Sequence, residues 1–151
     1  MKKLTLAALL LITALCALTA CSTLDWPFAN SRTISIQADT DANQNSATAI
    51  DIVLVYDQAA LSQLPQTGPE WFTKKAALTA GLGDAMKVVS LQIPPAKLID
   101  DVPLPKHAKK AVAVYCYTNY LSIGGQAMGD LTNFKKVRIK LQEQTVGYEA
   151  Y

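Results

Sequence analysis

Hydrophobic and polar residues alternate with a period of two over much of the chain beyond residue 32. Four short segments show this alternation: residues 33–37, 50–57, 112–117 and 136–141. A further apolar run covers residues 86–92. Successive side chains of a strand point to opposite faces, so such alternation indicates half-buried strands. Val, Ile and Tyr are enriched in these segments, as strands favour. Residues 145–151 fit a short edge strand, and the chain is predicted to be mainly β.

One segment departs from this pattern. Gly68-Pro69 can open a helix, because the missing N–H of proline costs nothing in the first turn. Trp71 and Leu78 then lie seven residues apart, and Gly81 and Gly83 close the segment. The other connections carry no crossover helix, which favours antiparallel pairing. We therefore expect an antiparallel β-sandwich with a short helical insert between its second and third clear strands.

The first 20 residues have a different character. Lys2 and Lys3 precede an uncharged run, and small residues then lead into Cys21 in the sequence Leu18-Thr19-Ala20-Cys21. A basic start, an apolar middle and small residues at the end are typical of a secretory signal peptide. The last four residues resemble the lipobox of bacterial lipoproteins. That resemblance implies cleavage before Cys21, attachment of diacylglycerol to its thiol, and palmitate among the lipid groups of the protein.

The alternative for this segment is a retained transmembrane helix. Its uncharged run of 17 residues lies at the short limit of the roughly 17–25 residues needed to span a bilayer. We therefore predict a signal peptide over residues 1–20, a lipidated tether over 21–31 and a β-sandwich domain over 32–151. Ser22 stands where aspartate would mark inner-membrane retention, so the lipoprotein resemblance implies the periplasmic face of the outer membrane.

Composition and charge narrow the possible functions. The chain has 151 residues, of which 50% are hydrophobic and 17% charged, which fits one globular domain with short appendages. Without residues 1–20, Lys plus Arg falls from 14 to 12 and equals the 12 Asp plus Glu. A neutral mature chain argues against nucleic-acid binding, which needs clustered Lys and Arg. The lysine pairs at 74–75, 109–110 and 135–136 are interpreted as solubilising surface rather than lipid-binding patches.

The sequence predicts no catalytic site and no enzyme. His107 is the only histidine, and no carboxylate or nucleophile lies near it in the sequence. Asp100 and Asp101 are adjacent, so in an extended segment they point to opposite faces. Cys116 lies in a predicted strand and is expected to be buried and inert.

A metal site is not predicted either. Residues 39–45 carry oxygen-bearing side chains at alternating positions, a spacing that calcium loops use. An EF-hand loop also needs glycine at its sixth position and a bidentate glutamate at its twelfth, where this chain has Gln44 and Ile50. We therefore interpret the segment as a polar loop between strands, with no metal and no cofactor.

The order of these features resembles the TssJ/SciN family, the outer-membrane lipoproteins of bacterial type VI secretion. The resemblance rests on the lipobox, a first strand, a polar loop, the strand Ile50-Asp51-Ile52-Val53-Leu54-Val55-Tyr56-Asp57, the aromatic pair Trp71-Phe72 and the later strands 111–119 and 136–141. It implies a transthyretin-like β-sandwich with an added helical portion. It also implies a structural role in protein secretion, anchoring the membrane complex to the outer membrane by binding the periplasmic region of the inner-membrane protein TssM.

In that family the loop between the first two strands contacts the partner. Here the corresponding loop spans residues 39–48, and the resemblance implies partner-binding candidates at Asp39, Asp41, Asn43, Gln44, Asn45 and Ser46. Two other functions remain open. An unrelated periplasmic lipoprotein acting as a ligand- or protein-binding module would show a concave apolar pocket. A small envelope enzyme would bring His107 together with carboxylates in a cleft.

Overall fold

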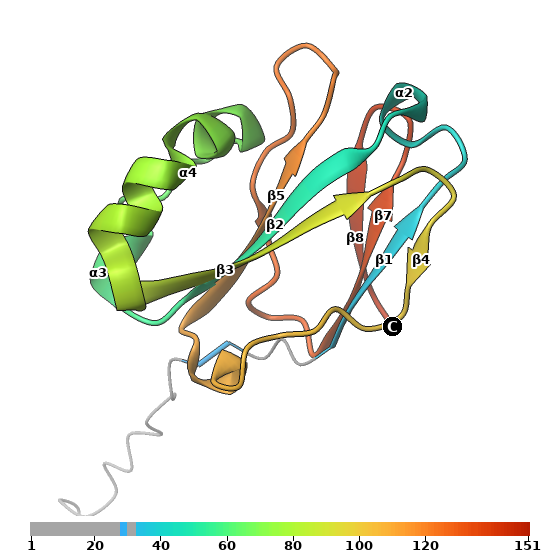
Figure 1. Cartoon of the computed structure of the whole chain (residues 1–151). Coiled ribbons are helices and arrows are strands. Elements are labelled where there is room, and N and C mark those ends of the chain that lie inside the picture. The colour runs from blue at the N-terminus through green and yellow to red at the C-terminus, as the bar shows by residue number, and fades with distance from the viewer. Residues whose placement is uncertain (1–27, 30–32) are drawn as a thin grey trace, which may run out of the picture.

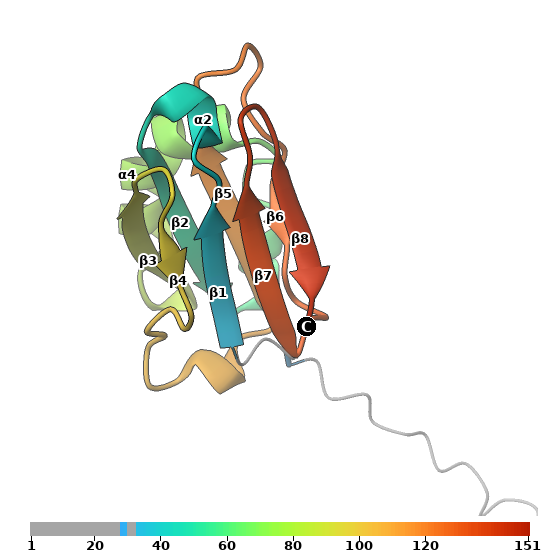
Figure 2. The same ribbon diagram turned by 90° about the vertical axis from the view of Figure 1, so that its right-hand side faces the viewer.

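A computed structural model describes residues 28–29 and 33–151, which form two four-stranded β-sheets packed face to face (Figures 1 and 2). The first sheet has the order β4-β1-β7-β8, with bounds Leu98–Ile99, Thr33–Ala38, Lys136–Leu141 and Val146–Ala150. The second has the order β3-β2-β5-β6, with bounds Met86–Ile93, Thr48–Val55, Ala113–Asn119 and Gly129–Asp130. The helical elements are α2 (Ala42–Asn45), α3 (Gln58–Leu61), α4 (Gly68–Leu82), η2 (Gly83–Ala85) and η3 (Ala108–Lys110).

The main core fills the space between the two sheets. Ile34, Ile52, Cys116, Ile139 and Leu141 are fully buried there, and they come from four different strands. These are inward-facing positions of alternating segments, so the period-two pattern correctly predicted the buried face of each strand.

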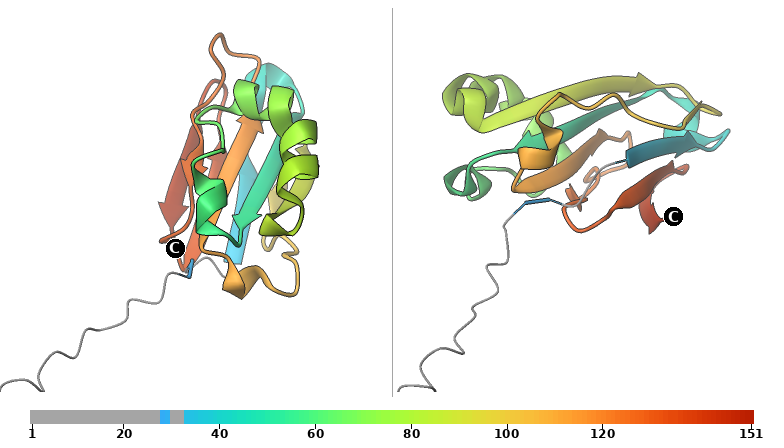
Figure 3. Two further views of the ribbon diagram at one scale, coloured as in Figure 1. Left: turned by 90° about the vertical axis from the view of Figure 1, so that its left-hand side faces the viewer. Right: turned by 90° about the horizontal axis from the view of Figure 1, so that it is seen from below.

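A second apolar cluster lies on the outer face of the second sheet, beneath α4 (Figure 3, left). Val53 and Val55 of β2 pack there with Trp71 of α4 and Tyr117 of β5. The Trp71 and Tyr117 rings stack with centroids 4.6 Å apart and an interplanar angle of 10°. Because β2 is covered on both faces, its sequence is a nearly continuous apolar run.

Helix α4 begins and ends where the sequence predicted. The Thr67 side chain accepts a hydrogen bond from the Glu70 amide at 3.4 Å, and Pro69 occupies the first turn. Gly83, with φ of 50°, ends the helix. Gly68 lies so close to β5 that a Cβ there would stand 2.3 Å from the Thr118 carbonyl oxygen. The helical insert thus lies between β2 and β3, as expected, and its first residue is held against the sheet.

The expectation of antiparallel pairing is wrong for one pair of strands. β1 and β7 are parallel, with Thr33 opposite Lys136 and Ala38 opposite Leu141. Parallel neighbours need a long crossover connection. Here that connection is the whole second sheet with its helices, because the chain leaves the first sheet after β1, returns only briefly as β4 and comes back as β7. The other strand pairs of the described sheets are antiparallel.

The described part of the N-terminal segment is attached to the domain. The Ala29 amide donates a hydrogen bond to the Ala111 carbonyl oxygen at 2.7 Å, and Ala29 packs against the main core. Cys21, the predicted signal peptide and most of the predicted tether lie outside the described residues. Within the described ranges, no helix is long and apolar enough to cross a membrane.

Candidate functional site

Three connections meet at one end of the sandwich, which we call the loop end. It consists of the β1–β2 loop (residues 39–47), the β5–β6 loop (120–128) and the β7–β8 turn (142–145), which lie together at the top of Figure 1. Backbone hydrogen bonds join the first to the third: Asn43 N donates to Gln142 O at 3.0 Å and Gln44 N to Glu143 O at 3.1 Å. Most of the predicted polar loop therefore lies at this end, while Thr48 belongs to β2, opposite Ile93.

Asn43 holds the loop end together from inside. It is 2% exposed, and its side-chain oxygen accepts a hydrogen bond from the Leu121 amide at 2.8 Å. Its amide nitrogen donates to the Asn119 carbonyl oxygen at 3.4 Å. Residues 43–45 all have positive φ, between 49° and 64°, a region in which asparagine is tolerated better than most residues. Because Asn43 is buried and bonded to both Asn119 and Leu121, its side chain orders the two loops.

The other predicted partner-binding residues lie further out. Asp39, Asp41, Gln44 and Asn45 are exposed and Ser46 is half-buried. Asp41, Gln44 and Asn45 line a surface hollow of about 670 Å³ together with residues of the other two connections: Ser122, Ile123, Glu143 and Gln144. Two carboxylates and no basic side chain line this hollow. The arrangement suits a partner segment that carries a positive charge.

The β5–β6 loop adds two apolar side chains that the sequence interpretation did not include. Leu121 is 63% exposed and Ile123 is fully exposed. The loop is fixed at its base, since the Leu121 amide is held by Asn43 and the Gln126 side chain donates to the Gln144 carbonyl oxygen at 2.7 Å. Exposed aliphatic residues on an ordered loop are typical anchors of protein interfaces. The available sequence signal was their position just before the turn residues Gly124-Gly125, with Ile123 adjacent to Gly124.

Tyr120 fixes the β7–β8 turn. It is 6% exposed, and its hydroxyl oxygen lies 3.0 Å from the Gln142 carbonyl oxygen and 3.1 Å from that of Thr145. Burial raises the pKa of the Tyr120 hydroxyl to about 12, so it remains a hydrogen-bond donor over the physiological range. The loop end is thus an ordered surface supported by buried polar groups.

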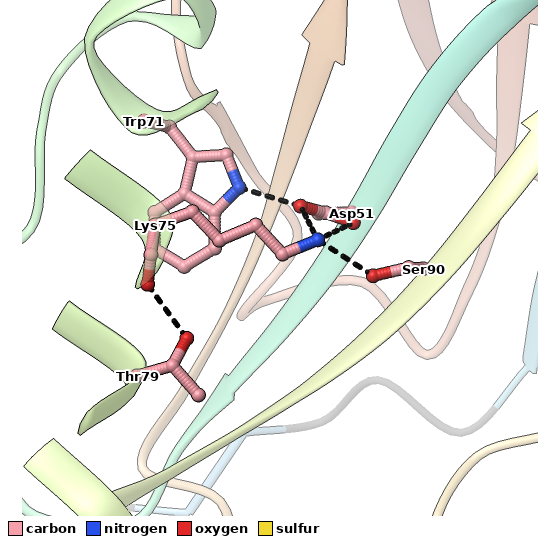
Figure 4. Close-up of polar contacts among 5 residues, drawn as sticks. All are labelled: Asp51, Trp71, Lys75, Thr79 and Ser90. Carbon is pink, nitrogen blue, oxygen red and sulfur yellow. Dashed lines mark hydrogen bonds and ion pairs between the residues drawn. The ribbon is translucent and has the colours of Figure 1, made fainter. Parts of the chain in front are cut away.

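A buried charged group lies on the outer face of β2 (Figure 4). The carboxylate of Asp51, whose side chain is 2% exposed, accepts a hydrogen bond from the Trp71 indole nitrogen at 2.7 Å. It also pairs with Lys75 at 2.8 Å, and the same ammonium donates to Ser90 at 2.8 Å. These contacts connect α4 to β2 and β3, so their role is to hold the helix on the sheet. The sequence signal was one acidic residue within the apolar strand 50–55.

The residues considered for catalysis do not assemble into a site. His107 is exposed and lines a hollow of about 390 Å³ that contains one carboxylate, Asp84. That carboxylate is exposed and forms an ion pair with Lys87 at 2.6 Å. Cys116 is a buried free cysteine, which confirms the expectation of burial. That burial raises the pKa of its thiol to about 12 and so disfavours the reactive thiolate. Among the described residues, no group of three or more His, Cys, Asp or Glu side chains is placed to hold a metal ion.

No family model matches the sequence, and no curated protein matches it. The fold does match solved structures. The lipoprotein TssJ1 of the Pseudomonas aeruginosa type VI secretion system is 12% identical, with a TM-score of 0.60 over 79% of this chain and 94% of its own. Lip of Serratia marcescens, a membrane-bound component of the type VI secretion system, is 11% identical, with a TM-score of 0.58 over 79% and 95%. A chain of a type VI membrane complex is 17% identical, with a TM-score of 0.50 over 77% and 95%.

These matches define the class of fold. It is a transthyretin-like, mainly β sandwich with a short helical insert, as the sequence predicted, and nearly the whole of each matched chain is covered. This protein has the fold of the TssJ and Lip lipoproteins of type VI secretion, which confirms the resemblance to the TssJ/SciN family at the level of fold.

Proposed function

We propose that this protein is the outer-membrane lipoprotein of a type VI secretion membrane complex. The observation that carries the proposal is the fold match, which covers 94% and 95% of two type VI secretion lipoproteins. The role is structural rather than enzymatic: the protein links the outer membrane to the periplasmic region of the inner-membrane component TssM.

The anchor in this proposal is Cys21. Cleavage of residues 1–20 leaves this cysteine at the N-terminus, and acylation holds the protein at the periplasmic face of the outer membrane. Each buried methylene contributes about 0.8 kcal/mol, so several acyl chains on Cys21 suffice for stable attachment. Residues 21–31 then form the tether, of which Ala29 is bonded to the sandwich through the Ala111 carbonyl. The first strand enters the sandwich at the end opposite the loop end (Figure 1), so an N-terminal anchor leaves the loop end free.

The docking surface in this proposal is the loop end. Asp41 and Glu143 supply negative charge, while Leu121 and Ile123 supply exposed apolar area. A central apolar anchor bordered by charged groups is the usual composition of a protein interface. Membrane attachment confines this surface to a thin layer and raises its effective concentration for a partner that arrives from the inner membrane.

The alternative of a ligand-binding module has little support from the sandwich interior. The space between the sheets is occupied by fully buried side chains, among them Ile34, Ile52 and Ile139. A ligand there would have to displace well-packed core residues. The hollows at the loop end and beside His107 are open to solvent. The larger of these two, at the loop end, is better suited to docking a protein than to enclosing a small ligand.

The proposal is tested by capture of crosslinked complexes from the native host. Tagged wild-type protein is compared with Cys21→Ser, which removes the acylated thiol, and with Asp41→Lys, which reverses one charge in the loop-end hollow. The wild type is expected to recover a large inner-membrane secretion protein, identified by mass spectrometry. Asp41→Lys is expected to reduce that recovery roughly tenfold, because the charge of the docking surface changes sign locally.

Glu70→Lys is the matched control, because it makes the same charge change at an exposed position of α4. It is expected to retain wild-type recovery. The proposal is wrong if the wild type recovers only outer-membrane biogenesis factors. Equal losses for Asp41→Lys and Glu70→Lys would remove the loop end from the proposal.

A further inference from the structure

The end of the sandwich opposite the loop end carries a cluster of exposed lysines, which we call the basal lysines. They come from two segments far apart in the sequence, the turn around η3 and the start of β7: Lys106, Lys109 and Lys110, with Lys135 and Lys136. The ion pairs of the described residues involve other lysines, namely Lys75, Lys87 and Lys140. Lys136 lies over the Tyr151 ring, 5.9 Å from its centroid. Since none of these ion pairs uses a basal lysine, the ammonium groups remain available to an external anionic partner.

Backbone contacts bring both segments to the place where the chain enters the domain. The Ala29 amide is bonded to the Ala111 carbonyl, directly after Lys110. Thr33, the first residue of β1, is the register partner of Lys136. Seen from below, η3 lies close to the short described segment of residues 28–29 (Figure 3, right). The basal lysines thus flank the segment that leads back to Cys21.

Acidic residues near this end are fewer than the basal lysines. Asp100 and Asp101 follow β4, where the Val102 amide bonds to the Ile34 carbonyl of β1. The Asp84 carboxylate is engaged by Lys87 at 2.6 Å. Asp57 also lies near this end, because the Val55 carbonyl two residues before it accepts a hydrogen bond from the Val112 amide. Tyr151 follows Ala150, the register partner of Val137. The positive charge of this end is therefore confined to the two groups of lysines, around η3 and at the start of β7.

Part of the basal cluster borders a hollow. Lys106, Lys110 and His107 line it together with Tyr56, Asp84, Lys87 and Pro105, and its volume is about 390 Å³. Since Asp84 is already paired with Lys87, the two remaining lysines are the unpaired charges of this lining. A concave surface with unpaired ammonium groups suits a phosphate-bearing headgroup.

We propose that the basal lysines bind anionic phospholipid headgroups, so that the sandwich stands on the membrane with its loop end directed away from it. This inference rests on the lipid anchor of the proposed function. Cys21 precedes Ala29 by eight residues, which at full extension span at most about 26–29 Å. Each basic side chain near an anionic surface multiplies binding roughly fivefold. Several lysines at the end nearest the anchor therefore favour one orientation over the others.

Two of the lysine pairs in the sequence belong to the basal lysines. In the sequence, the pairs at 109–110 and 135–136 are separate and look like solubilising surface. In the fold they share one end with Lys106 and with the entering chain. Lys74 and Lys97 lie elsewhere, on α4 and on the β3–β4 connection next to Ala38. They serve as internal controls within the same molecule.

The test uses the full lipoprotein, purified from membranes and reconstituted into vesicles of phosphatidylcholine alone or with phosphatidylglycerol at about one lipid in three. Lysines are labelled with an amine-reactive ester, and the rate at each site is read by mass spectrometry. Anionic vesicles are expected to slow labelling of Lys109, Lys110, Lys135 and Lys136 by at least about threefold. Lys74 and Lys97 are expected to label equally fast in both vesicles. High salt is expected to abolish the difference, because surface electrostatic attraction is screened.

A variant with Lys109→Glu and Lys135→Glu provides the second arm, matched by Lys74→Glu with Lys97→Glu. The first is expected to lose the protection of Lys110 and Lys136, and the second to keep it. A protein that floats with both vesicles but labels equally fast at every lysine would overturn this inference and leave the anchor intact. A protein that fails to float with vesicles would overturn the anchor, and this inference with it.

Discussion

Asp51 places a carboxylate inside the molecule at a position where the strand pattern favours an apolar residue. Its two oxygens accept from Trp71 and Lys75, so the carboxylate is paired and hydrogen-bonded. Lys75 remains one-third exposed, because its stem lies along α4 while the ammonium reaches the sheet. Burying such an ion pair has a large desolvation cost that offsets its attraction. Its effect is therefore measured as the decrease in the free energy of unfolding when one partner is removed.

We predict that Asp51→Ala lowers the free energy of unfolding by about 2–4 kcal/mol. The change leaves the buried Trp71 N–H without an acceptor and Lys75 without its counter-ion. Urea denaturation of the mature chain measures the loss. Ser90→Ala is the control, because it removes only the exposed contact to Lys75 and should cost less than about 1 kcal/mol. Equal midpoints for the two variants would show that the carboxylate does not hold the helix.

At the scale of elements, the attachment of α4 depends on the one glycine that faces β5. A Cβ on Gly68 would meet the Thr118 carbonyl oxygen at 2.3 Å, whereas a Cβ on Gly81, in the same helix, would meet nothing within 4 Å. We predict that Gly68→Ala destabilises the fold by about 1–3 kcal/mol. Gly81→Ala should stabilise it by about 0.5–1 kcal/mol, because alanine is the better helix former.

Thermal unfolding of both variants measures these opposite changes in stability, a lower melting temperature for Gly68→Ala and a higher one for Gly81→Ala. The same substitution is made in one helix, so any difference reports the local environment rather than the residue type. A Gly68→Ala protein as stable as the Gly81→Ala protein would mean that α4 can move away from β5 at no cost.

Strands and helices with a clear hydrophobic period or capping residues could be predicted from the sequence. Strands that exist only because they pair with residues far along the chain could not. The strands at 50–55 and 136–141 and the helix between Gly68 and Gly83 follow from periodicity and capping residues. The two-residue strands β4 and β6 have too few positions to show a period. The parallel pairing of β1 with β7 joins the two ends of the domain, and no local pattern encodes it.

In the candidate site, too, local features could be predicted from the sequence, whereas features that depend on tertiary contacts could not. Residues 39–46 could be assigned to a loop between strands from polarity alone, and they lie at the loop end. Polarity did not show that Asn43 turns inward or that Ile123 joins the same surface from a loop about eighty residues away. Both facts follow from tertiary contacts, since the hollow is formed only where three connections meet.

The whole molecule has two ends of different chemistry. The loop end combines Asp41, Glu143 and exposed aliphatic side chains, while the opposite end combines the basal lysines with the entry of the chain. A protein held between a membrane and a partner needs two such surfaces on opposite sides. The rigid sandwich between them sets their separation, so docking at one end leaves the other unobstructed.

Docking of the loop end to the inner-membrane component can be measured by site-specific photo-crosslinking in the native host. A photoreactive amino acid is placed at Ile123 in the loop end, and in a second protein at Lys74 on the exposed part of α4. If the loop end is the docking surface, position 123 gives an adduct with a large inner-membrane secretion protein and position 74 gives none. An adduct with that protein only from position 74, or adducts from position 123 only with unrelated outer-membrane proteins, would contradict it.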